Sequence, residues 1–134
     1  MRYSLHSRSA RGFSLLELSV TIAVILLLAG FVTISVQPFV AYRDGTAAGE
    51  MLRSVKAAEL MYLADNPATP ITALTQANLL PYMPPGNWPT LPSVNGQTPT
   101  IDFNNYFPPV AVLNGNRYDP SGSTTDGLWD VGKY

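Results

Sequence analysis

The pattern of apolar and polar positions changes near residue 43. The 25 residues from Leu18 to Tyr42 contain no Asp, Glu, Lys or Arg, and residues 23–32 are apolar without a break. As a helix, the apolar-dominated stretch 13–36 would be roughly 36 Å long, which is enough to cross a bilayer with some tilt. The remaining residues are too few to surround so long an apolar helix in a soluble protein. We therefore expect residues 13–38 to form a transmembrane helix.

A second pattern follows this apolar stretch. Charged residues (Glu50, Arg53, Lys56 and Glu59) interleave with an apolar stripe at helical spacing, which consists of Ala48, Met51, Leu52, Val55, Ala58 and Tyr62. The stripe predicts an amphipathic helix that continues the first one, so that a single helix runs over about residues 13–64. Pro38, Gly45 and Gly49 interrupt the run, and they are expected to kink the helix or melt it locally.

The rest of the chain reads as short elements joined by turns. A short helix is expected over residues 71–80, closed by Pro81. Two Asn-Gly pairs predict β-hairpins with type I′ turns: Asn95-Gly96 between residues 91–94 and 98–103, and Asn114-Gly115 between residues 110–113 and 116–118. A last strand is expected over residues 128–131. The fold class is then α+β, with the long hydrophobic N-terminal helix packed on a small antiparallel β-sheet head in residues 39–134.

Composition and charge exclude several classes of function. Eight Lys and Arg residues against nine Asp and Glu residues give a net charge of −1, so the chain has no basic excess for binding nucleic acid. Cysteine is absent and His6 is the single histidine, which removes thiol catalysis, disulfides and zinc sites made from thiolates. Because His6 lies in the first few residues, an imidazole base would have to act from there, and an enzyme is not expected.

The first twelve residues have the character of a leader. They contain Arg2, Arg8 and Arg11 but no acidic residue, and an apolar segment follows them. Residues 31–38 lack the small-residue cleavage pattern of an ordinary secretory signal. The arginines are expected to keep the N-terminus in the cytoplasm, which places everything after about Pro38 outside it.

The junction between leader and helix reads Arg11-Gly12-Phe13-Ser14-Leu15-Leu16-Glu17-Leu18. This run resembles the type III signal of type IV prepilins and of the related pseudopilins. The resemblance implies the pilin fold, and it implies that a prepilin peptidase and methyltransferase removes residues 1–12 by cutting between Gly12 and Phe13 and then N-methylates Phe13. It also implies a single-pass protein of the bacterial inner membrane, which later enters a periplasmic or extracellular filament.

Glu17 calls for a physical account of its own. A carboxylate costs about 2.5–3.5 kcal/mol at the centre of a bilayer, so Glu17 either extends into the headgroup region near the helix start or has a partner. After cleavage, the amino group of Phe13 in a neighbouring subunit is a better-placed partner than the amino group of the same chain. The resemblance assigns Glu17 this assembly role. It implies as further partners other copies of the chain, related pilins in a helical filament and an inner-membrane assembly platform.

The acidic residues of the tail offer a weak candidate for a metal site. Asp119, Asp126 and Asp130 lie among serine, threonine and glycine residues, which supplies oxygen ligands of the kind calcium prefers. Their spacing matches no EF-hand, and such segments also form plain surface turns. No other cofactor is expected.

Three functions remain open at this stage. The first is a structural subunit of a type IV pilus or a related filament. The second is a pseudopilin of type II secretion, which shares every N-terminal feature. The third is an uncleaved binding module that is anchored by a single transmembrane span. Its intact mass would show that residues 1–12 are still present.

Overall fold

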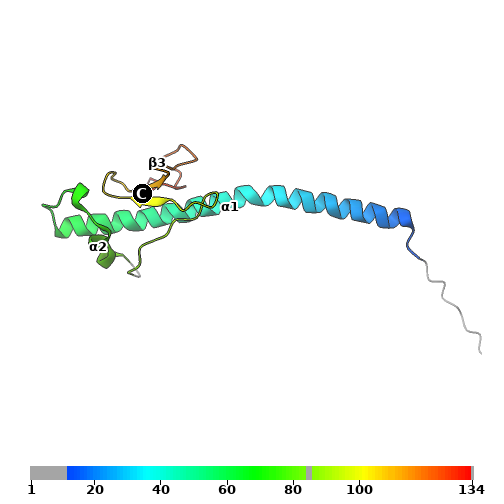
Figure 1. Ribbon diagram of the computed structural model, residues 1–134, viewed down its shortest axis with the longest axis horizontal. Helices are drawn as coiled ribbons and strands as arrows, with labels where there is room; N and C mark the ends of the chain where they lie inside the picture. Colours follow the sequence, from blue (N-terminus) through cyan, green and yellow to red (C-terminus); the bar gives the residue numbers. More distant parts are fainter. Residues whose placement is uncertain (1–11, 84–85, 134) are drawn as a thin grey trace, which may run out of the picture. The chain divides into compact units, whose positions relative to one another are not determined.

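A computed structural model describes residues 12–83 and 86–133 (Figure 1). The chain divides into two compact units, residues 1–37 and residues 38–134. One helix, α1, runs from Leu15 to Asp65 and contributes to both units, and the described strands all belong to the second unit, which we call the head. The structure is therefore α+β, as predicted, with a long apolar N-terminal helix and a small antiparallel sheet.

Helix α1 spans 51 residues and agrees closely with the helix predicted over about residues 13–64. Pro38, Gly45 and Gly49 all lie within it, so the local melting predicted there is not seen. A proline removes one backbone hydrogen bond, and the many cooperative turns on either side keep a long helix intact.

Among the described residues, the sheet of the head has three strands in the order β1-β2-β3, all antiparallel. Strand β1 is Thr100–Asp102, β2 is Val110–Leu113 and β3 is Asn116–Arg117. The hairpin predicted at Asn114-Gly115 is confirmed: Leu113 pairs with Asn116, and the two turn residues have φ angles of 54° and 79°. Both central φ angles are positive in a type I′ turn, which explains the choice of Asn and Gly.

The other predicted hairpin is wrong in its strand pairing. Asn95 and Gly96 do form a turn with φ angles of 50° and 78°, but only one isolated bridge, Val94 with Gln97, closes it. Residues 100–102 pair with β2 instead. Pro92 and Pro99 lie in the two flanking runs, and each lacks the N–H group that an extended ladder would need.

The single helix predicted over residues 71–80 is also wrong. The segment consists of a 3-10 helix η1 (Ile71–Ala73), a one-turn helix α2 (Gln76–Leu79) and a 3-10 helix η2 (Leu80–Tyr82), with Pro81 inside η2. Thr75 starts α2 because its backbone N–H donates to Asn78 Oδ1 at 3.0 Å in a capping box. A new helix start at Thr75 prevents η1 and α2 from merging.

The apolar stripe of α1 forms the core of the head, as predicted. Ala48, Leu52, Val55 and Ala58 are fully buried. Two clusters pack on the stripe: Ala48 and Leu52 meet Leu91, Ala111, Trp129 and Val131, whereas Val55 and Ala58 meet Leu74, Leu79 and Met83. The stripe thereby holds the sheet, the η1–η2 segment and the end of the chain on one helix face.

The strand predicted over residues 128–131 is wrong, because residues 127–132 form a loop that crosses α1. We call this segment the C-terminal loop. Trp129 has a φ angle of 59°, and its N–H donates to the carbonyl of Gly45 at 3.0 Å. Arg53 Nε donates to the carbonyl of Val131 at 2.9 Å. A Cβ atom built on Gly49 would lie 2.1 Å from the carbonyl oxygen of Gly127, so the helix glycines provide the space for this crossing.

Candidate processing and assembly site

The start of α1 is fixed by Ser14. The hydroxyl Oγ of Ser14 accepts the N–H of Glu17 at 3.2 Å, and the Ser14 carbonyl accepts the N–H of Leu18 at 3.1 Å. These two bonds make Ser14 the N-cap, so the helix begins at Leu15 rather than at Phe13. The sequence carries a signal for this cap, because Ser14-Leu15-Leu16-Glu17 has the S-x-x-E spacing of a capping box.

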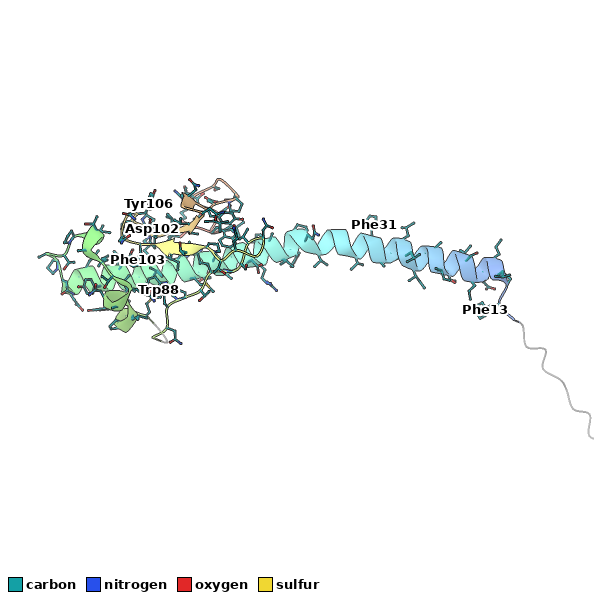
Figure 2. All side chains as sticks on the ribbon, viewed as in Figure 1. Phe13, Phe31, Trp88, Asp102, Phe103 and Tyr106 are labelled. Carbon is teal, nitrogen blue, oxygen red and sulfur yellow. The ribbon has the colours of Figure 1, made fainter. Side chains whose placement is uncertain are left out.

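The peptide bond between Gly12 and Phe13 lies outside the helix. Gly12, Phe13 and Ser14 have no regular secondary structure, and 78% of Phe13 is exposed (Figure 2). A Cβ atom on Gly12 would meet nothing within 4 Å. The packing of this chain therefore does not require glycine at position 12. A requirement for a small residue there would have to come from another protein that binds this segment.

Glu17 lies in the first turn of α1 and is exposed. Within the described residues its carboxylate makes no hydrogen bond and no ion pair: the capping box is only half formed, because the bond from the Ser14 N–H to the Glu17 side chain is missing. The first turn favours a negative charge through the helix dipole. Glu17 thus presents a free carboxylate one helical turn from Phe13.

The surface of α1 over the first unit is apolar. Its large side chains are half or more exposed over most of this stretch, including Phe31 at 71% (Figure 2). The hydroxyls of Ser19 and Thr21 donate back to the carbonyls of Leu16 and Leu18 at 2.9 Å and 2.8 Å, so their protons are already satisfied inside the helix. By length and composition α1 is able to cross a membrane, and none of its most apolar window is buried.

Comparison with known families settles what this N-terminal segment is. Residues 7–33 carry the prokaryotic N-terminal methylation motif. This motif is the signal of type IV prepilins and pseudopilins, which are precursors of structural subunits. No curated protein and no solved structure shows a significant match to the chain. Together with the exposed apolar helix, the methylation motif indicates that the chain is anchored in a membrane.

The methylation motif contains three of the residues predicted to be functional. Gly12, Phe13 and Glu17 lie within residues 7–33, and the structure brings them together at the start of α1 with Ser14 between them. Arg11 lies outside the described residues. The arrangement provides an exposed peptide bond, a capped helix start and an unpaired carboxylate within six residues of chain.

The three aspartates of the tail each bind to their own turn. Asp119 Oδ1 accepts the hydroxyl of Ser121 at 2.7 Å, Asp126 Oδ1 accepts the N–H of Leu128 at 2.9 Å, and Asp130 Oδ1 accepts the N–H of Gly132. In residues 12–83 and 86–133 no group of three or more acidic, His or Cys side chains is placed to hold a metal ion. Burial raises the pKa of Asp130, and the charges of Asp126 and Asp119 raise it further.

Proposed function

We propose that the chain is the precursor of a type IV pilus subunit, or of a related filament. In this proposal the prepilin peptidase cuts between Gly12 and Phe13 and methylates the new amino group of Phe13. The subunit is first anchored in the inner membrane with its N-terminus facing the cytoplasm, and it then polymerises through the apolar part of α1. The observation that carries the proposal is the methylation motif placed directly before an exposed apolar helix.

The local geometry supports the proposed cleavage. Peptidases bind extended substrates, and the Ser14 cap leaves the Gly12–Phe13 bond two residues before the first helical residue. Cleavage there would leave the new amino group one residue before the helix cap. In that position it could reach the free Glu17 carboxylate of a neighbouring copy.

Replacement of Gly12 tests the proposed cleavage. We expect Gly12→Val to accumulate at full length in the membrane, because a peptidase that seats glycine closely has no room for a β-branched side chain. The chain itself would tolerate the change, since the Cβ position at Gly12 is open. Intact-mass spectrometry of the membrane fraction measures the result when the chain is expressed with a prepilin peptidase.

Gly30→Val is the matched control, because Gly30 also lies in residues 7–33 and its Cβ position is equally open. It should be processed like the wild type. Normal processing of Gly12→Val would reject the cleavage site, and a wild-type chain that keeps its first twelve residues would favour the uncleaved, anchored binding module.

The pseudopilin of type II secretion shares the same signal, and the methylation motif does not separate it from a pilus subunit. Electron microscopy of the cell surface distinguishes the two. Long surface filaments that contain the chain, identified by mass spectrometry, are expected for a pilus subunit. A pseudopilin would instead be needed for the secretion of folded proteins without forming such filaments.

A further inference from the structure

A cavity of about 340 Å³ opens on the head, within residues 106–132. The loop before β2, strand β3 and the end of the chain form its walls, to which Tyr106, Phe107, Arg117, Thr124 and Asp130 contribute. We call it the Tyr106 cavity, after one of its two aromatic residues, which is labelled in Figure 2. None of these residues belongs to the methylation motif, so the cavity lies outside the segment proposed above for processing and polymerisation.

The polar groups on this wall have unused hydrogen-bonding capacity. Asp130 is only 4% exposed, and while its Oδ1 accepts the Gly132 N–H, its Oδ2 is buried without a partner. Within the described residues the side chains of Arg117 and Thr124 form no hydrogen bond or ion pair either. Buried carboxylate oxygens are nearly always hydrogen-bonded in native proteins. The cavity wall thus offers the exposed donors of Arg117 and the exposed hydroxyl of Thr124, which serves as donor or acceptor, together with a buried carboxylate oxygen that solvent does not reach.

Two aromatic residues give the cavity an apolar surface. Tyr106 is 49% exposed and Phe107 is 45% exposed, and in the described chain after α1 these are the large hydrophobic residues that remain exposed. The other described aromatic residues that follow Tyr42 pack in edge-to-face pairs, such as Trp88 with Phe103 and Tyr118 with Trp129. Exposed rings beside unpaired polar groups are typical of a ligand site rather than of a core.

We propose that the Tyr106 cavity binds a neutral pyranose ring of a carbohydrate. A pyranose has an apolar face that stacks on Tyr106 or Phe107. Its hydroxyl groups can accept from Arg117 and exchange hydrogen bonds with Thr124 at the same time. Other ligand classes match less of the wall. The carboxyl group of Asp130 disfavours an anion, and the positive charge of Arg117 repels a simple cation. A purely apolar ligand would leave the polar groups without hydrogen bonds. A zwitterion matches the two charges, but it would have to give up the hydration of both its own charges, which costs far more than the hydration that a neutral hydroxyl gives up.

Saturation-transfer NMR of the full-length protein tests this proposal. The protein is held in lauryldimethylamine oxide micelles, which contain no sugar, and it is titrated with the methyl pyranosides of mannose, galactose, glucose and N-acetylglucosamine. At least one glycoside should show saturation of its ring protons, with a dissociation constant in about the millimolar range. Glycine serves as the zwitterionic probe under the same conditions.

Three variants locate the binding. Tyr106→Ser removes the stacking ring, and Arg117→Gln replaces the charged guanidinium with a shorter, neutral amide. Each should weaken binding by at least about tenfold, while far-UV circular dichroism shows a folded head. Lys133→Gln makes the same charge change outside the cavity wall and should bind like the wild type.

The proposal is overturned if no glycoside binds, or if both Tyr106→Ser and Arg117→Gln bind as well as Lys133→Gln. Binding of glycine without any glycoside would reject it in favour of a zwitterion site. None of these outcomes bears on cleavage after Gly12, which the mass of the chain reports separately.

Discussion

At the scale of single residues, Ser14 and Glu17 have different roles at the helix start. Ser14 satisfies the backbone N–H of Glu17, so the Glu17 side chain is not needed as a cap. The carboxylate remains exposed, and no described residue of the same chain pairs with it. A free charge at the edge of an apolar helix is unfavourable in lipid, so pairing with the amino group of a neighbouring subunit would stabilise it.

We predict that Glu17→Ala still enters the membrane and is still cut, but that filament assembly falls or stops. Insertion should become easier, because a charge has left the apolar segment. Immunoblots of membranes report processing, and the yield of sheared filaments reports assembly. Ser19→Ala is a suitable control, since the Ser19 hydroxyl only bonds back to its own helix. A wild-type yield of filaments from Glu17→Ala would mean that Glu17 merely extends into the headgroup region.

Glu59 is the most unusual titratable residue of the head. It lies on α1 with no exposed surface, and neither carboxylate oxygen has a hydrogen-bond partner. Burial raises its pKa from 4.5 to about 8, because the charged form is poorly solvated there. The residue is therefore protonated in the folded protein at neutral pH, whereas in the unfolded chain it ionises above about pH 4.5.

The raised pKa predicts that the head becomes less stable as the pH rises from about 4.5 to about 8. Over this window the folded state holds a proton that the unfolded state has lost, so the free energy of unfolding falls with pH, by about 3 kcal/mol at pH 7. Below pH 4.5 both states are protonated and this penalty is absent. Thermal unfolding followed by circular dichroism at a series of pH values measures the slope.

Glu59→Gln mimics the protonated form and should remove most of that slope, making the head more stable than the wild type at pH 8 and similar to it near pH 5. Asp130 also has a raised pKa and contributes in the same direction at the acidic end. Glu50→Gln is the control, because Glu50 is an exposed acid on the same helix. Parallel pH profiles for Glu59→Gln and the wild type would show that Glu59 is solvated in the folded head.

At the scale of elements, the sequence correctly predicted the features that depend on residues close together in the chain. The helix, its apolar stripe and the Asn114-Gly115 hairpin follow from spacing and turn chemistry within a few residues. The pairing of residues 100–102 with β2 was not predicted, because β2 lies eight residues further on and no Asn-Gly pair stands between the two strands. The C-terminal loop was mistaken for a strand since its apolar residues pack on α1, more than 70 residues away, rather than on a sheet.

The helix glycines provide a test at this scale. Gly49→Ala is expected to destabilise the head by about 1–3 kcal/mol, because the new methyl group would overlap the carbonyl oxygens of Gly127 and Asp130, and backbone atoms yield little. By helix propensity alone the same change would be stabilising. The sign of the effect therefore reports whether the C-terminal loop crosses α1 at this position, and the midpoint of thermal unfolding measures it.

Thr46→Ala is the matched control for Gly49→Ala. Thr46 lies one turn away on an exposed part of α1, and its hydroxyl bonds only to the carbonyl of Tyr42. Its effect should stay within about 0.5 kcal/mol. Equal unfolding midpoints for the two variants would mean that the loop does not pack closely on Gly49.

At the scale of the whole molecule, the two units use the same helix for different purposes. In the head, the apolar stripe of α1 is covered by two core clusters, so its burial is completed within one chain. In the first unit, large apolar side chains from Leu15 to Val36 stay exposed and nothing in the described chain covers them. The sequence predicted this contrast, because lipid-facing and core-facing helices differ in the width of their apolar surface.

The exposed apolar part of α1 should therefore decide whether the chain is soluble. Fully burying one large apolar side chain stabilises by roughly 1.5–3 kcal/mol, so in water the exposed residues between Leu15 and Val36 must pack against lipid, detergent or other copies. We predict that a chain lacking residues 1–37 is a soluble monomer, because it keeps both core clusters and all the described strands. The chain that starts at Phe13 should need detergent or polymerise. Analytical ultracentrifugation and electron microscopy of the two proteins compare them directly, and filaments formed by the shorter one would show that the head, not α1, holds the polymer together.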